Sequence, residues 1–118
     1  ILFLSASYAD ENNMSSNIDD YSCKYVLFKA PTIKKYSLKA INSDFLDSCK
    51  YYDNLAKSYL IITLDHLQKC TCINKDVLHR LKNIVTNKKH ASLLSCINKY
   101  YYTLKWLDKT VENIINCR

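Results

Sequence analysis

Six cysteines are the most reactive side chains in this chain of 118 residues: Cys23, Cys49, Cys70, Cys72, Cys96 and Cys117. An even number of cysteines in so short a chain is typical of an exported domain in which all of them form disulfides. We therefore expect up to three disulfide bonds. Six cysteines can pair in many ways, and their positions along the sequence do not by themselves select one pairing.

A zinc site is the alternative use of the same thiols. His66 and Cys70 are spaced to share one face of a helix, and Cys72 and His79 follow closely in the sequence. The spacing is not that of a standard zinc finger, and an oxidising compartment favours disulfides over thiolate ligands. We expect no metal site and no cofactor.

Catalysis would need a nucleophile, a base and an orienting group held together in one pocket. The three histidines, His66, His79 and His90, fall on or beside expected helices, where surface and capping roles are usual. Glycine is absent, which argues against a glycine-rich phosphate loop. We therefore expect that the protein is not an enzyme. The carboxylates are scattered in a way that suits helix caps and ion pairs with nearby lysines: Asp44, Asp47, Asp53, Asp65, Asp76, Asp108 and Glu112.

The composition predicts one helical domain with a basic surface. Hydrophobic residues make up 48% of the chain, whereas the absence of glycine and the single proline disfavour a β-rich fold with many turns. The net charge of +6 has two explanations, solvated lysines on helix surfaces or attraction to an acidic partner such as a sulfated glycan. Arginine is scarce and no nucleic-acid-binding motif occurs, so nucleic acid is not an expected partner.

The first residues predict export. Residues 1–9, ILFLSASYA, are an apolar run ending in small residues, which resembles the end of a secretory signal peptide; an N-terminal strand is the alternative. Residues 10–22 are polar and acidic, and we expect them to be mobile. Within them Asn13 begins a glycosylation sequon. The remainder is expected to be a secreted, extracellular domain at residues 23–118 with no membrane insertion.

The strongest periodic pattern covers residues 90–115 and predicts an amphipathic helix. The run of Tyr100, Tyr101 and Tyr102 covers more than half of a helix circumference, so at least one tyrosine should lie near the surface; Tyr101, Tyr102 and Trp106 would widen the apolar face. Cys96 and Cys117 would be about 30 Å apart on a straight helix, too far to pair with each other. The expected core positions are Leu93, Ile97, Tyr100, Leu104, Leu107, Val111 and Ile114.

Three further helices are expected before it. The first falls within residues 24–42, with Pro31 in its first turn. The second covers 44–69, capped by Ser43 and Asp44, and the third covers 75–86, capped by Asn74. Together the four predict an all-α fold, a small disulfide-stapled helical bundle. The expected inner positions of the second helix are Phe45, Cys49, Tyr52, Ala56, Tyr59, Thr63 and Leu67, flanked by Leu46, Leu55, Leu60 and Leu64.

Several short motifs in residues 50–110 together resemble the C-terminal half of the interleukin-10 cytokine family, and most closely the subgroup of interleukins 19, 20 and 24. They are Leu55-Ala56-x-Ser58-Tyr59-Leu60, Leu67-Gln68-Lys69-Cys70-Thr71-Cys72, His90-Ala91 and Leu104-x-Trp106-Leu107-Asp108-Lys109. The family's Gly-Glu-Leu-Asp stretch is replaced here by Asn98-Lys99-Tyr100-Tyr101, its paired adjacent cysteines are absent, and the N-terminal half is shorter.

The resemblance implies a secreted cytokine mimic that binds class II cytokine receptors of the interleukin-20 type and activates or blocks signalling. The bias toward lysine, asparagine, isoleucine and tyrosine suits an AT-rich genome and suggests a virus-encoded homologue. By analogy with the family, Cys23 and Cys49 would pair with Cys70 and Cys72, and a monomer is expected. Acidic glycans are a further candidate partner. The candidate receptor contacts are Lys34, Lys35, Lys39, Lys105, Lys109 and Glu112.

Two rival functions share the helical fold. One is a short-chain four-helix cytokine of the interleukin-4 type, which a disulfide between the N-terminal region and Cys117 would favour. The other is a secreted disulfide-rich helical effector unrelated to cytokines. Pairing of both Cys23 and Cys49 with the Cys70/Cys72 element would instead favour the interleukin-10 family.

Overall fold

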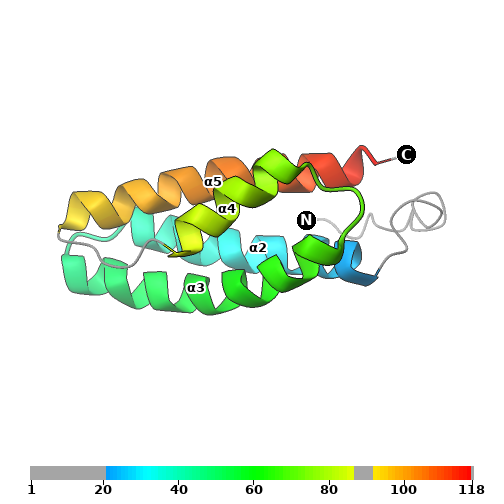
Figure 1. Cartoon of the computed structure of the whole chain (residues 1–118). Helices are drawn as coiled ribbons and strands as arrows, with labels where there is room; N and C mark the ends of the chain where they lie inside the picture. Colours follow the sequence, from blue (N-terminus) through cyan, green and yellow to red (C-terminus); the bar gives the residue numbers. More distant parts are fainter. Residues whose placement is uncertain (1–20, 87–91, 118) are drawn as a thin grey trace.

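The computed structural model of this chain describes residues 21–86 and 92–117. Within these residues the chain forms four α-helices and no strand, and three disulfides join them. The expected all-α, disulfide-stapled bundle is therefore confirmed. The helices, labelled as in Figure 1, are α2 (Tyr21–Ile41), α3 (Leu46–Lys69), α4 (Lys75–Thr86) and α5 (Leu93–Ile115).

The helices run alternately up and down the bundle (Figure 1). Helix α2 packs lengthwise against both α3 and α5, which run parallel to each other, and α4 covers α3 and α5 over part of their length. Because α3 and α5 are parallel, residues that lie opposite one another on the two helices are separated by a nearly constant number of positions in the sequence. The Cys49–Cys96 bond spans 47 positions, and the Lys99–Asp53 pair spans 46.

The bundle has a larger and a smaller group of buried side chains. The larger group includes Leu60, Leu67 and Leu107 and draws on all four helices. The smaller group is built around Tyr100 and the Cys49–Cys96 bond, with two alanines, Ala40 and Ala56. The alanines make room for the tyrosine ring, since a bulkier residue would compete for the same space.

Helix α4 begins and ends where the sequence predicts, and its capping residue is confirmed. The side-chain oxygen of Asn74 accepts a hydrogen bond of 2.7 Å from the backbone N–H of Asp76. Helix α3 begins at Leu46 rather than residue 44, and the predicted capping by Ser43 and Asp44 is wrong. The Ser43 hydroxyl instead donates to the carbonyl oxygen of Lys39 at 2.9 Å, which serves the end of α2.

The positions of Pro31 and Phe45 relative to their helices differ from the prediction. Pro31 lies in the interior of α2 rather than in its first turn, because the helix already begins at Tyr21. Its ring occupies an exposed position on the helix. Phe45, predicted to be buried, is 72% exposed at the start of α3. Residues 1–20, with Asn13, and also His90 lie outside the described residues. The last two residues of the predicted mobile segment 10–22, Tyr21 and Ser22, instead begin α2, so that boundary is wrong.

The buried face of α5 only partly matches the predicted apolar positions, of which Tyr100, Leu107 and Ile114 are confirmed as buried. Cys96, Thr103 and Thr110 are completely buried, whereas Leu93, Ile97, Leu104 and Val111 are only partly buried. The threonines fit there because each hydroxyl donates to a backbone carbonyl of the same helix, that of Lys99 and that of Trp106. The helix therefore presents small polar residues to the bundle centre.

The three consecutive tyrosines separate as the helix geometry requires. Tyr100 is fully buried, while Tyr101 and Tyr102 are 58% and 59% exposed, which confirms that at least one tyrosine reaches the surface. The prediction that Tyr101 and Tyr102 widen the apolar face is wrong. Trp106 is partly buried against the larger core group, as that prediction required of it.

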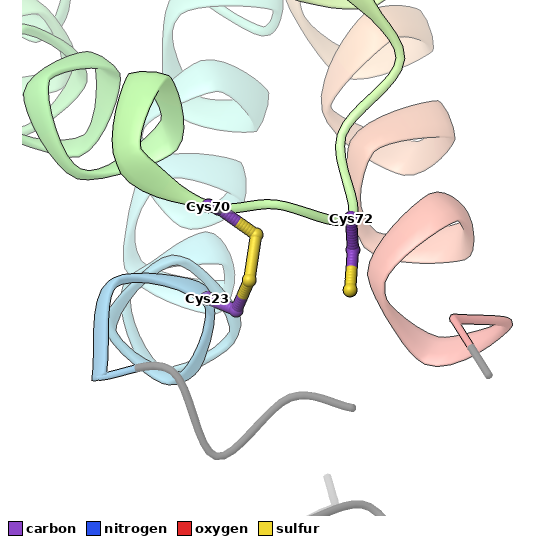
Figure 2. Close-up of side chains that lie close together, drawn as sticks. All are labelled: Cys23, Cys70 and Cys72. Carbon is purple, nitrogen blue, oxygen red and sulfur yellow. A yellow bond between two sulfur atoms is a disulfide. The ribbon is translucent and has the colours of Figure 1, made fainter. Parts of the chain in front are cut away.

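Disulfides tie both ends of the bundle. Cys23–Cys70 joins the start of α2 to the end of α3, and Cys72 lies beside this bond (Figure 2). Cys72 is bonded to Cys117 at the end of α5. The three Cα–Cα distances, 4.9, 6.3 and 5.6 Å, all suit a disulfide. The Cys49–Cys96 bond lies near the opposite end, where α3 and α5 begin.

The pairing corrects what the family resemblance implies. Cys23 does pair with Cys70, but Cys49 pairs with Cys96 on α5 and not with the Cys70/Cys72 element. The parallel arrangement of α3 and α5 explains the difference, because it places Cys49 and Cys96 side by side near the same end of the bundle. Cys96 and Cys117 do not pair with each other, as the length of α5 predicts.

We predict that removing the Cys49–Cys96 bond destabilises the protein. The bond spans 47 positions, and opening a loop of that length lowers the free energy of unfolding by about 4 kcal/mol in the chain-entropy model. The measurement is urea unfolding of the Cys49→Ala/Cys96→Ala variant. Mass spectrometry of a non-reduced digest should recover Cys49 linked to Cys96; recovery of Cys49 linked to Cys70 or Cys72 would contradict this topology.

Candidate interaction surface

Three polar side chains meet inside the bundle, one from α3 and two consecutive ones from α5. The ammonium group of Lys99 on α5 donates to a carboxylate oxygen of Asp53 on α3 at 2.8 Å. The Tyr100 hydroxyl donates to the same carboxylate oxygen and lies 3.2 Å from the backbone carbonyl oxygen of Asp53. Asp53, predicted among the scattered carboxylates, is therefore a buried ion-pair partner.

This cluster holds the helices in place and is closed to solvent. The side chains of Lys99 and Asp53 are 3% and 11% exposed. Burial, reinforced by the hydrogen bond and the negative charge of Asp53, raises the pKa of Tyr100 well above its ordinary value of 10.0. A buried charge pair is stable only while both partners are present. We therefore infer that the role of this cluster is to fix the alignment of α3 with α5.

The residues of the zinc alternative have other partners. The His66 ring stacks on Tyr25 with centroids 3.9 Å apart, and His79 lies 3.3 Å from the side-chain amide of Asn83. The sulfur atoms of Cys23, Cys70 and Cys72 lie within 4.8 Å of one another (Figure 2), but each belongs to a disulfide. Zinc requires cysteine as thiolate, so the oxidised protein offers no such ligand here.

A groove of about 670 Å³ lies between α2 and α5. Its walls are mostly apolar, and charged groups from both helices flank it: Lys34 from α2 and Asp108 and Glu112 from α5. An apolar floor with charges of both signs at its edges can bury a partner's side chain and orient it by ion pairs. The remaining lining residues are Leu27, Ala30, Pro31, Leu107, Val111, Ile115 and Asn116.

The local sequence of both helices creates this groove. On α2, Ala30 and Pro31 are small side chains at adjacent positions and leave space between the helices. On α5, the row Leu107, Val111 and Ile115 repeats every fourth residue and forms a continuous apolar ridge. Ile115 is 45% exposed, so the ridge continues from the core to the surface.

The structure brings two of the six candidate receptor contacts to the groove, namely Lys34 and Glu112. Lys35 and Lys39 lie on another side of α2, each 5.6 Å from the centroid of an aromatic ring. Lys105 is 5.2 Å from the Trp106 ring, and Lys109 is exposed elsewhere on α5. The six residues therefore do not form one surface.

Sequence reasoning missed the apolar part of the groove. The sequence predicts Leu107 and Val111 only as core positions and Asp108 only as an ion-pair partner. The signal that could have identified the groove is the fourth-residue row that continues past the seam to Ile115. The opposite wall could not have been identified in this way, because it requires knowing that α2 packs against α5.

Comparisons of this chain with protein-family models, with curated proteins and with solved structures find no match. No helix among residues 21–86 and 92–117 has the length and apolar character needed to cross a membrane. A proposal for function must therefore be argued from the groove, the charge distribution and the sequence motifs.

We predict that Asp53→Leu lowers the free energy of unfolding by about 3–5 kcal/mol, because the ammonium group of Lys99 stays buried without its partner. The double variant Asp53→Leu/Lys99→Met should recover much of this loss, since it leaves no unpaired charge. Asp65→Leu is the control, because it removes an exposed pair with Lys69 that contributes about 1 kcal/mol or less. Equal stability of the single and double Asp53 variants in urea unfolding would contradict the assignment.

We predict that Tyr100 makes the protein less stable above pH 10. Because the pKa of Tyr100 is raised in the folded state, its contribution is complete below the unfolded value near 10 and is lost as pH rises above it. The expected decrease is up to about 1.4 kcal/mol per pH unit from this one group. Urea unfolding between pH 9 and pH 11 measures it for the natural chain and for Tyr100→Phe, in which the slope should be smaller. An unchanged slope in Tyr100→Phe would contradict it.

Proposed function

We propose that this chain is a secreted helical ligand of cell-surface class II cytokine receptors of the interleukin-20 receptor type. It would act by association alone, either bringing two receptor chains together or occupying one and blocking the other. The observation that carries the proposal is the groove between α2 and α5, an apolar furrow with Lys34 on one edge and Asp108 and Glu112 on the other.

The architecture supports this proposal in two ways. Of the motifs that resemble the interleukin-10 family, residues 55–60 lie on α3, residues 67–72 cover the end of α3 and the turn after it, and residues 104–109 lie on α5. These three motifs belong to one packed unit, and His90-Ala91 lies outside the described residues. Three disulfides in so short a chain suit an oxidising, extracellular environment. Rigid helices joined at both ends would present a preorganised surface, which lowers the entropic cost of binding.

The disulfide pairing distinguishes the rival functions only in part. A bond from the N-terminal region to Cys117 would have favoured the interleukin-4 type rival, but Cys23 is bonded to Cys70 and Cys117 to Cys72. The disulfide pairing therefore does not favour the interleukin-4 type. The full pairing that would have favoured the interleukin-10 family is also absent, because Cys49 is bonded to Cys96. A secreted helical effector unrelated to cytokines is thus the main rival, and receptor binding separates the two.

We predict that the purified protein binds immobilised interleukin-20 receptor ectodomains, measured by surface plasmon resonance, and that Ile115→Asp weakens this binding about 10-fold or more. The new carboxylate would have to be desolvated inside the groove. Ile62→Asp is the matched control, because Ile62 is similarly exposed, at 48%, but lies on α3 away from the groove.

Two results would count against the proposal. Failure to bind any class II receptor would reject the cytokine function and leave the unrelated effector. Binding that Ile115→Asp and Ile62→Asp weaken equally would keep the receptor but remove the groove from the interface. Charge reversal of Lys34 and Glu112 provides a second test of the groove, since their groups lie at its edges and tolerate substitution better than its floor.

A further inference from the structure

The positive charge of this protein is concentrated on one helix. Helix α2 carries five lysines and no acidic residue, a charge of +5 against a net +6 for the whole chain. Helices α3 and α5 each mix lysines with carboxylates. Lysines also occur elsewhere in the chain, but there acidic residues offset them, and no acidic residue lies within α2. The five are Lys24, Lys29, Lys34, Lys35 and Lys39.

None of these lysines forms an ion pair with a described carboxylate. The ion pairs within residues 21–86 and 92–117 join Asp65 to Lys69, Asp76 to Arg80, and Asp53 to Lys99, and none of them includes a lysine of α2. A run of unpaired like charges repels itself, and this repulsion is relieved when an anion binds.

Aromatic rings support three of the five ammonium groups. Lys29 lies 5.3 Å from the centroids of both Phe28 and Tyr59, and Lys35 lies 5.6 Å from that of Tyr36. Lys39 lies 5.6 Å from the centroid of Tyr52 on α3. Cation–π contacts hold an ammonium group in position without neutralising it, so the charge remains available to a ligand. The stacked pair of Tyr36 and Tyr59 links the two helices beneath these lysines.

The exposed lysines form a line along the outer side of α2. We name this line the α2 stripe and define it as Lys24, Phe28, Lys35 and Lys39, with Lys29 at its edge. The four named first are all exposed and recur at helical spacing, and the stripe is about 22 Å long at 1.5 Å per residue. Lys34 belongs instead to the groove side of α2. A line of fixed positive charges matches an elongated polymer that carries anionic groups at intervals.

We infer that the α2 stripe binds a sulfated polysaccharide. Each ammonium group is a compact charge with several donors, which suits contact with separate sulfate groups. Three disulfides suit an oxidising environment outside the cell, where such polymers are exposed. The inference is independent of the proposed receptor, because the stripe and the groove share no residue.

The composition of the stripe favours a glycan over the two other polyanions. Proteins that read nucleic acids rely heavily on arginine, and α2 contains none. A helix that lies on a membrane needs a broad apolar face turned outward. The apolar face of α2 is buried in the bundle, and its large exposed apolar side chains are limited to Tyr21, Phe28 and Leu38.

The test compares two variants that lose the same charge. Lys24→Gln/Lys35→Gln/Lys39→Gln removes three charges from the stripe, and Lys50→Gln/Lys75→Gln/Lys82→Gln removes three exposed charges from α3 and α4. Binding to immobilised heparin is measured by surface plasmon resonance at several salt concentrations. We expect the stripe variant to bind about 10-fold more weakly or worse and with a shallower salt dependence, because fewer counterions are released. The control should change by about 2-fold or less.

Several outcomes would overturn the inference. Equal weakening of the two variants would show that net charge rather than the stripe governs binding, and an unchanged stripe variant would remove the stripe altogether. Equally tight binding of chemically desulfated heparin or of duplex DNA would reject sulfate as the recognised group. Tighter binding to phosphatidylserine vesicles than to heparin, lost in Phe28→Ser, would assign the stripe to a membrane surface. A native circular dichroism spectrum of the stripe variant excludes misfolding. Binding to heparin is measured without any receptor, so failure of the proposed receptor would leave this result unchanged.

Discussion

The alignment of α3 with α5 is the constraint on which the other packing depends. A covalent bond between Cys49 and Cys96 and a buried ion pair between Asp53 and Lys99 fix it within one turn of each helix. Shifting one helix by a residue would strain the disulfide bond, and it would separate the two charges of the ion pair inside the core. Once the two parallel helices are locked together, α2 can pack against both of them along its whole length.

Helix α2 consequently has two different accessible sides, one at the groove and one on the outside of the bundle. One side faces α5 and contributes Lys34, Ala30 and Pro31 to the groove. The outer side carries the stripe, where lysines rest on aromatic rings shared with α3. Lys34 and Lys35 are adjacent in sequence but differ by about 100° around the helix axis, which is why one belongs to each side. A receptor chain and an extended anion could therefore occupy α2 at the same time, and each would lie against a rigid surface.

The family resemblance depends on the sequence, whereas the disulfide pairing depends on the three-dimensional packing. The resemblance depends on short motifs in α3, in the turn after α3 and in α5, and on their order in the chain, whereas the pairing depends on which helix ends meet in space. Cys49 pairs with Cys96 because both lie about one turn inside parallel helices. The resemblance therefore implied correctly that Cys23 pairs with the Cys70/Cys72 element, and it missed the partner of Cys49.

The amino-acid sequence by itself determined the helical fold class, the position of α4, the exposure of one or more of the three tyrosines, and the impossibility of a Cys96–Cys117 bond. Those features follow from local periodicity, capping and the rise of a helix. Only the tertiary structure decided that Asp53 meets Lys99, that Leu107 and Val111 line a groove with α2, and that the ion pairs within residues 21–86 and 92–117 include no lysine of α2. The reason is physical: each of these depends on which faces of separate helices meet, and helical periodicity identifies a buried face without identifying the helix that covers it.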